Sequence, residues 1–254
     1  MLISIIIATY NASNTLKRCL DSIVSQITSE TELVIIDGGS KDDTNEIINS
    51  YGDKISVHIS EPDKGIYDAW NKGIKLSHGV WIMFIGADDI LLPNAVNTYL
   101  DTIKNTVNIN SYDYICAHNE FVDMKGNVLK IMGKEPTWNR MRRYMSAAHV
   151  ASLHNRKNLF NVVGLYNLNF KICADYELLL RKKGHLSYLF INTHIAQMRI
   201  GGMSFSVQAI IETFKIRKQH KSISEGINAL LFIRDWLAYN FFIIINILKG
   251  RTIK

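Results

Sequence analysis

Almost wholly apolar runs, each closed by a polar turn, are the feature that most constrains how this chain can fold. Residues 3–8, 32–37 and 80–85 are dominated by isoleucine, valine and other apolar residues, and 55–60 is a weaker run of the same kind. Strands covered by helices on both faces have this composition. Helical patterns lie between the runs, so the alternation predicts an α/β fold with a parallel, doubly wound sheet.

The second half of the sequence is less regular but continues as mixed α/β structure. No linker, low-complexity tract or internal repeat divides it, which favours one catalytic unit with a C-terminal appendage. The predicted elements are strands at 112–120, 128–132, 150–154 and 187–192, and a helix at 174–183.

The appendage contains an apolar segment, residues 227–248, that is long enough to cross a bilayer as a helix. Arg234 and Asp235 near its middle make spanning costly. On a helical wheel Asn228, Asp235 and Asn246 form a narrow polar stripe, and basic residues flank both ends. An amphipathic helix in the membrane interface fits this pattern, and a helix docked on the core or on a partner subunit is the alternative.

Overall composition narrows the class of protein and its compartment. Of 254 residues, 47% are apolar and 20% charged, which is typical of globular chains. The formal charge of +6 comes without any nucleic-acid-binding motif, so no nucleic-acid partner is expected. Three widely spaced cysteines fit neither a zinc pattern nor a disulfide framework, which indicates reduced thiols and a cytoplasmic protein.

Three aspartates follow the ends of predicted strands. Asp37 ends the second apolar run, and Asp88 and Asp89 follow the run at 80–85. Ligands of open α/β sheets bind beyond the carboxyl ends of the strands, and adjacent carboxylates suit a hard divalent cation that also binds phosphate oxygens. A turn or helix cap is the ordinary role of any one of them. The turn at 8–15 lacks the glycines of a dinucleotide-binding loop, and no P-loop sequence occurs.

Five segments together resemble one enzyme family. They are SIIIATYNASNTLKRCLDSIVSQ, ELVIIDGGSKDDT, DKGIYDAWNKGI, GVWIMFIGADD and KICADYELLLRKKG, in this order from Ser4 onward. The set is similar to the inverting family-2 glycosyltransferases. That resemblance implies a GT-A-type domain at 1–206, with a central, mostly parallel twisted sheet flanked by helices. Residues 1–110 would form its nucleotide-sugar-binding half and 111–206 its acceptor half, followed by a helical, membrane-associating tail at 207–254.

The resemblance also implies roles for individual residues. Asp175 would be the catalytic base and Asp89 the ligand of a divalent metal, Mn²⁺ or Mg²⁺. Ala174 and Ala87 stand where relatives carry further acidic residues. The nucleotide-sugar-binding residues would be Thr9, Tyr10, Asp37, Asn71, Lys72 and Asp88.

Asp175 also fits the role of base on chemical grounds. Inversion by single displacement needs a carboxylate that takes the proton of the acceptor hydroxyl, and a helix N-terminus can present one to a cleft. The helix dipole is expected to lower the pKa of that carboxylate. A plain helix cap is the alternative role.

Other candidates are weaker. His149 and Trp138 are candidates for the acceptor site, although a core role is the alternative for each. Arg199, Gly201, Gly202 and Ser204 form a glycine-rich stretch that would touch the diphosphate or form a simple turn.

The sequence and the resemblance together predict an inverting, metal-dependent hexosyltransferase. It would transfer sugar from an NDP-sugar, UDP-hexose or UDP-N-acetylhexosamine, to a lipid-linked or oligosaccharide acceptor in bacterial O-antigen (lipopolysaccharide) or exopolysaccharide synthesis. The enzyme would lie on the cytoplasmic face of the inner membrane. The alternative is a non-catalytic, membrane-anchoring subunit of a polysaccharide assembly complex.

Overall fold

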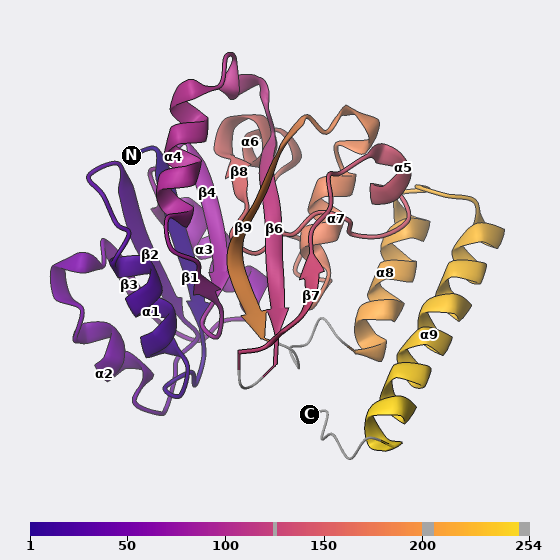
Figure 1. Cartoon of the computed structure of the whole chain (residues 1–254), viewed down its shortest axis with the longest axis horizontal. Helices are drawn as coiled ribbons and strands as arrows, with labels where there is room; N and C mark the ends of the chain where they lie inside the picture. The colour runs from indigo at the N-terminus through magenta and orange to yellow at the C-terminus, as the bar shows by residue number, and fades with distance from the viewer. Residues whose placement is uncertain (124–125, 200–205, 249–254) are drawn as a thin grey trace.

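The computed structural model describes residues 1–123, 126–199 and 206–248, with side chains described up to residue 245. Gly201, Gly202 and Ser204 of the predicted glycine-rich stretch therefore lie outside the described residues. The described strands form one sheet in the order β3-β2-β1-β4-β8-β6-β9-β5, with β7 paired to β6 (Figure 1). The strands are β1 (Ile3–Thr9), β2 (Thr31–Asp37), β3 (Val57–Ser60), β4 (Trp81–Gly86), β5 (Ile90–Leu91), β6 (Tyr114–Val122), β7 (Val128–Met132), β8 (Leu153–Asn155) and β9 (Tyr188–Arg199).

The sheet is mostly parallel, as the alternating sequence pattern predicts. Strands β3, β2, β1 and β4 pair in parallel. Strand β8 is antiparallel to both β4 and β6, so β6 runs in the direction of β4, and β9 runs parallel to β6. Strands β5, β7 and β8 run the other way. The carboxyl ends of the main strands therefore share one edge, the lower edge in Figure 1.

Helices cover both faces of the sheet and create two cores. Ile5 and Ile7 of β1 pack in one core with residues of α1 and α4, whereas Ile6 packs in the other with residues of α3 and α7. Alternate residues of a strand point to opposite faces, which explains why all of them are apolar. The helices are α1 (Leu16–Val24), α2 (Thr44–Asn49), α3 (Ile66–Leu76), α4 (Ala95–Asn105), α5 (Trp138–Met141), α6 (Asn161–Val163), α7 (Ala174–Leu180), α8 (Val207–Gln219) and α9 (Glu225–Leu248).

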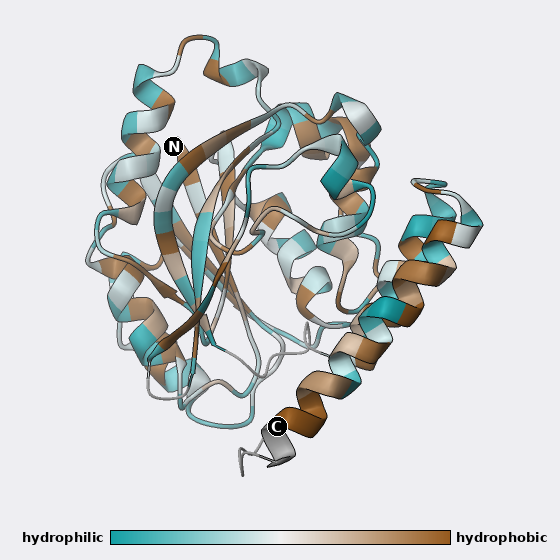
Figure 2. Ribbon diagram, turned by 45° about the vertical axis from the view of Figure 1, so that its right-hand side comes forward, coloured by the Kyte–Doolittle hydropathy of each residue, from teal (hydrophilic) through white to brown (hydrophobic). Residues whose placement is uncertain are grey.

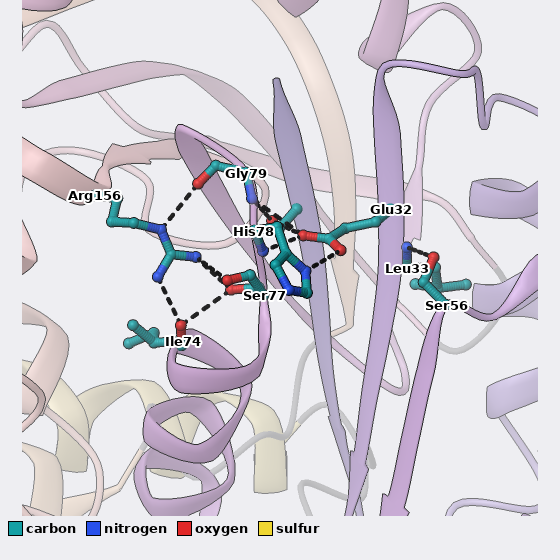
Figure 3. Close-up of polar contacts among 9 residues, drawn as sticks. Glu32, Leu33, Ser56, Ile74, Ser77, His78, Gly79 and Arg156 are labelled. Carbon is teal, nitrogen blue, oxygen red and sulfur yellow. Dashed lines mark hydrogen bonds and ion pairs between the residues drawn. The ribbon is translucent and has the colours of Figure 1, made fainter. Parts of the chain in front are cut away.

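A buried polar cluster closes the opposite, amino edge of the sheet (Figure 3). Glu32, at 3% exposure, accepts hydrogen bonds from the Ser4 hydroxyl at 2.5 Å and from the backbone N–H groups of His78 and Gly79. The Arg156 guanidinium donates to the Ile74 carbonyl in the last turn of α3 and to the Ser77 and Gly79 carbonyls of the α3–β4 loop. Glu32 is thus a structural carboxylate, because its oxygens are used to anchor that loop to β1 and β2.

The second half differs from the predicted elements mainly in length. Strand β9 extends to Arg199, because its second part pairs with β5 as well as β6. Helix α7 ends at Leu180, and Arg181 instead turns its guanidinium to Glu177 and to the carbonyls of Val163 and Leu165. Neither tertiary contact can be read from local sequence.

Helices α8 and α9 pair along one flank of the molecule (Figures 1 and 2). Ile216 of α8 belongs to the core, and Arg217 is fully buried. The polar stripe of α9 faces α8: Asn228 donates to the Phe214 carbonyl at 3.0 Å, and the Asp235 carboxylate lies 3.8 Å from the Arg217 guanidinium. The apolar side of α9 is consequently the one that is exposed. The side chain of Asn246, the third member of the predicted stripe, is outside the described side chains.

Candidate functional site

The pairing register brings Thr9, Asp37 and Asp88 of the predicted nucleotide-binding residues to one edge. Thr9 of β1 lies beside Asp37 of β2, Asp37 lies beside Ser60 of β3, and Ala8 lies beside Gly86 of β4. The turn that carries Asp88 and Asp89 follows Gly86 directly. A parallel sheet aligns its strand ends in this way, so these side chains surround the place where α/β sheets bind ligands.

Asp37 is fully buried and holds the loop after β2 in place. Its Oδ2 accepts from the backbone N–H groups of Gly39 and Ser40 at 3.1 and 2.9 Å, and from the Ser60 hydroxyl at 2.5 Å. Burial raises the pKa of Asp37, but the hydrogen bonds from Ser40, Ser60 and Asn45 outweigh it and the net pKa lies below its ordinary value. The carboxylate is therefore ionised, and it shapes the edge of the site through residues 38–40.

Thr9 and Tyr10 differ in exposure. Thr9 is 4% exposed, and its hydroxyl has no hydrogen-bond partner within the described part of the chain. Tyr10 is 63% exposed, and a ring carbon lies 3.3 Å from the position that a Cβ on Gly38 would take. A large exposed ring beside a glycine offers a flat surface for a base to stack on.

Asp88 and Asp89 form an unneutralised acidic pair. Asp88 is exposed, whereas Asp89 is 6% exposed and its Oδ2 accepts from the Gly86 N–H at 3.1 Å. Burial and the charge of Asp88 raise the pKa of Asp89 well above its ordinary value. Among the described side chains, no lysine, arginine or histidine pairs with either carboxylate.

The geometry of this pair accommodates a divalent cation. An oxygen of Asp89 and one of Asp88 lie 2.8 and 3.0 Å from the point where a Cβ on Gly86 would sit, so the glycine leaves a space between two carboxylates. The described residues contain no cluster of three or more metal-ligating side chains. Two carboxylates still fit a hard cation such as Mg²⁺ or Mn²⁺ that takes its other ligands from phosphate oxygens and water.

Asn71 and Lys72 are both engaged with protein groups. The Asn71 amide donates to the Tyr166 carbonyl at 3.0 Å and accepts from the Tyr166 N–H at 2.9 Å. Lys72 forms an ion pair with Glu61 at 2.8 Å and donates to the Pro62 carbonyl. Asn71 thus braces the segment before α7, and Lys72 braces the segment after β3.

Asp175 lies in the first turn of α7 and is partly buried. Its Oδ1 accepts from the Tyr67 hydroxyl at 3.1 Å. Tyr67 belongs to the first turn of α3, which follows β3, and helices that follow parallel strands begin at the carboxyl edge. Asp175 is thereby brought to the same edge as the Asp88–Asp89 pair.

The pKa of Asp175 is shifted in the direction opposite to the one expected from the sequence. The helix dipole was expected to lower it, but burial raises the pKa to about 6, although hydrogen bonds from the Tyr176 N–H and the Tyr67 hydroxyl lower it in part. A carboxylate with a pKa just below neutrality is mostly ionised at pH 7 and is a stronger base than an exposed aspartate.

His149 and Trp138, the predicted acceptor-site candidates, have different surroundings. His149 is buried; its Nδ1 bonds with His154 Nε2 and its Nε2 with the Tyr166 hydroxyl, both at 3.1 Å. Burial lowers the pKa of His149 to about 3, so this ring is a neutral core residue. Trp138 of α5 lines a hollow of about 360 Å³ with Lys183 and His220, beyond the C-terminal end of α7. His149 is linked to the surroundings of Asp175 only indirectly, through Tyr166, whose ring packs against Tyr67.

Two residues at this site were not identified from the sequence. Tyr67 looks like one more core aromatic in GIYDAW, and Glu212 is a single acidic residue in an otherwise ordinary amphipathic helix. Glu212 is 3% exposed and accepts three backbone hydrogen bonds from residues 171–173, just before α7. The burial of Glu212 is visible only in the structure, so the sequence alone does not single this residue out.

The chain is similar to several named glycosyltransferases. It is 29% identical over 247 residues to a PGL/p-HBAD biosynthesis glycosyltransferase of Mycobacterium bovis, covering 92% of this chain and 90% of the relative. An uncharacterized glycosyltransferase of Rickettsia prowazekii is 29% identical over 184 residues, covering 70% of this chain and 57% of that protein.

Solved structures share its fold at low sequence identity. Staphylococcus aureus TarS (residues 1–349) in complex with UDP superposes with a TM-score of 0.69 at 16% identity, covering 93% of this chain and 71% of that one. The mannosyltransferase PcManGT from Pyrobaculum calidifontis, in complex with GDP-Man and Mn²⁺, gives 0.62 at 11% identity, with coverages of 93% and 74%. These likenesses establish a GT-A-like fold.

The profile of one family, Glycosyl transferase family 2, matches residues 4–164. That range begins in β1 and contains the aligned strand ends and the Asp88–Asp89 turn. Because it covers more than half of the sequence, the chain belongs to glycosyl transferase family 2 and is a glycosyltransferase with a GT-A-like fold.

Proposed function

We propose that this glycosyltransferase is an inverting, metal-dependent enzyme. It uses a UDP-linked donor, a hexose or an N-acetylhexosamine, and a lipid-linked or oligosaccharide acceptor of bacterial O-antigen or exopolysaccharide synthesis. The observation that carries the proposal is the shared edge: a carboxylate with a pKa of about 6, Asp175, and the unneutralised pair Asp88–Asp89 flank one end of the sheet.

In this mechanism Asp175 is the general base. Its carboxylate accepts the proton of an acceptor hydroxyl while that oxygen attacks the anomeric carbon of the donor. The bond from the anomeric carbon to the diphosphate breaks on the opposite face, so an α-linked donor gives a β-linked product. The Tyr67 hydroxyl, 3.1 Å from Asp175 Oδ1, fixes the direction in which the carboxylate points.

Asp88 and Asp89 would hold the divalent metal. A bound Mn²⁺ or Mg²⁺ would neutralise the charge on the leaving diphosphate. The two aspartates would hold the metal beside the end of β4, and Gly86, which has no side chain, leaves the space between them open. Thr9, Tyr10 and the loop held by Asp37 would then surround the nucleoside part of the donor.

The donor class is supported by the fold neighbours. TarS has been solved with UDP and with UDP-GlcNAc, and PcManGT with GDP-Man and Mn²⁺, so nucleotide sugars are the ligands of similar folds. For this chain we propose that the nucleotide of the donor is UDP.

The membrane part of the proposal depends on α9. Among the described residues, one helix, Glu225–Ile245, is long and apolar enough to cross a membrane by length and composition, and only 6% of its most apolar part is buried. With Asp235 facing Arg217, α9 is instead proposed to lie in the interface on the cytoplasmic face of the inner membrane. Its lower end in Figure 1 lies toward the carboxyl edge of the sheet, where a lipid-linked acceptor is needed. The exposed apolar residues are Ile227, Leu230, Ile233, Trp236, Leu237, Phe241 and Ile244.

Calorimetric titration tests the donor and metal together. UDP, GDP and dTDP are titrated into the purified protein, each with and without Mn²⁺. We expect UDP to bind only with the metal, and Asp88→Ala or Asp89→Ala to weaken binding at least tenfold. Asp101→Ala, an exposed aspartate on α4, is the matched control.

The outcomes separate the candidate functions. Binding of GDP or dTDP instead of UDP would change the donor class but keep the transferase mechanism. Failure of folded protein to bind any of the three nucleotides would favour the non-catalytic, membrane-anchoring subunit.

A further inference from the structure

The carboxylate of Glu212 holds the backbone just before the catalytic helix. Its Oε1 accepts from the Lys171 N–H, and its Oε2 accepts from the N–H groups of Ile172 and Cys173, each at 2.9 Å. Glu212 comes from the middle of α8, far along the sequence, and is 3% exposed. Such charge-assisted bonds are short and directional, so three of them fix the path of this segment.

The same segment is fixed from the other side by α3. The Tyr67 hydroxyl lies 2.6 Å from the Ile172 carbonyl and 3.1 Å from Asp175 Oδ1. The N-terminus of α7 has no side-chain cap, since Cys173 forms no such bond. The orientation of the first turn of α7, which carries Asp175, therefore depends on contacts from Glu212 and Tyr67.

We propose that Glu212 is a positioning residue for the catalytic reaction: through residues 171–173 it holds Asp175 in the orientation that accepts the acceptor's proton. This inference rests on the proposed role of Asp175 as the base. Glu212 itself does not reach the reacting atoms, because both of its oxygens are used by the backbone.

Electrostatics give Glu212 a second effect on Asp175. Its negative charge is one of the causes that raise the pKa of Asp175, after burial. The other titratable groups around Asp175 are Tyr67 from α3, Cys173 from its own loop, Tyr166 and Tyr114. Burial raises the pKa of all four, so they stay neutral near pH 6 and do not produce the transition assigned to Asp175.

The test compares Glu212→Gln and Glu212→Asp with the wild-type protein. Glutamine keeps one acceptor oxygen but turns an NH₂ group toward a backbone N–H, whereas aspartate keeps the charge with a shorter reach. We expect kcat to fall roughly 10- to 100-fold in Glu212→Gln with KM for the donor changed less than twofold, since misplacement of a catalytic group by about 1 Å has this effect. Glu212→Asp should recover part of the loss. Glu225→Gln, exposed at the start of α9, is the control.

Two readouts are measured on each variant. The first is UDP release, with water as acceptor, from whichever of UDP-glucose, UDP-galactose and their N-acetylamino forms the wild-type protein turns over fastest. The second is the ¹³C NMR titration of the Asp175 carboxyl, which needs no substrate. In Glu212→Gln the acid limb of the rate profile and the Asp175 titration should both move to lower pH, which a purely structural role would not produce.

Asp175→Asn separates the inference from the function on which it rests. If Asp175→Asn abolishes turnover while both Glu212 variants keep wild-type kcat and an unchanged Asp175 titration, the positioning role is overturned and the base remains. If Asp175→Asn is fully active, the base assignment fails and the positioning role fails with it. If Glu212→Gln does not fold, the test depends on Glu212→Asp alone. A wild-type kcat in that variant would overturn the inference.

Discussion

Replacing Asp175 with asparagine should abolish turnover and at the same time stabilise the folded protein above pH 6. Burial raises the pKa of this carboxyl from 3.8 to about 6. A difference of about two pKa units corresponds to roughly 3 kcal/mol, which the fold loses whenever Asp175 is ionised. Because the side chain is only partly buried and the new amide needs partners of its own, we expect a net gain of about 1–3 kcal/mol.

The pH dependence of this gain follows from the direction of the shift. The folded state binds the Asp175 proton more tightly than the unfolded chain, so the group stabilises the fold below about pH 4 and this contribution is lost as pH rises through 6. Asparagine does not titrate. The stability of the variant relative to the wild-type protein should therefore be near zero at pH 4 and reach its full value above pH 7.

Urea unfolding followed by tryptophan fluorescence at pH 4.0 and 7.5 measures both quantities. Asp101→Asn, exposed on α4, should show no such pH-dependent gain. A variant that is no more stable than the wild-type protein at pH 7.5, or one that differs by the same amount at both pH values, would refute a buried, destabilising carboxylate at this position.

Four further changes should give measurable results. Glu32→Ala should lower stability by about 2–4 kcal/mol in urea unfolding, because it strands buried donors, yet leave kcat of the folded fraction unchanged. Asn71→Ala removes two buried hydrogen bonds to the Tyr166 backbone and should cost about 1–3 kcal/mol in the same measurement. Gly86→Ala would place a methyl group within 3.0 Å of both acidic side chains, and calorimetry should show metal-dependent UDP binding lost. Leu230→Asp combined with Leu237→Asp should abolish sedimentation with vesicles containing anionic phosphatidylglycerol while secondary structure by circular dichroism stays intact; unchanged sedimentation would contradict interfacial binding by α9.

The strands of the first half could be predicted because buried strands are recognisable as continuous apolar runs in the sequence. Strands β1 and β4 are apolar at nearly every position, since helices cover both of their faces, and the aspartates after the strands mark the functional edge. Strand β8, only three residues long, begins at Leu153 rather than Val150, because its bounds are set by pairing with β4 and β6.

The details of the site depend on tertiary contacts that local sequence does not encode. Adjacent residues in one turn, Asp88 and Asp89, have opposite exposure, and only the folded turn decides which one faces inward. A helical wheel of α9 shows the polar stripe at Asn228 and Asp235. It does not show that Phe214 and Arg217 of α8 contact this stripe. Burial likewise reversed the expected direction of the Asp175 pKa, because desolvation outweighs the helix dipole.

The continuous sheet has a mechanical consequence for substrate exchange. Strand β5, which follows the Asp88–Asp89 turn at once, pairs with β9, and the Leu92 N–H donates to the Ile195 carbonyl at 2.8 Å. Through β8 and β6, the same ladder joins the strands of residues 1–110 to the later strands of the sheet. Rotating one half away from the other would break these backbone hydrogen bonds. The enzyme should therefore bind and release its ligands as a rigid frame, with movement confined to loops and side chains at the carboxyl edge.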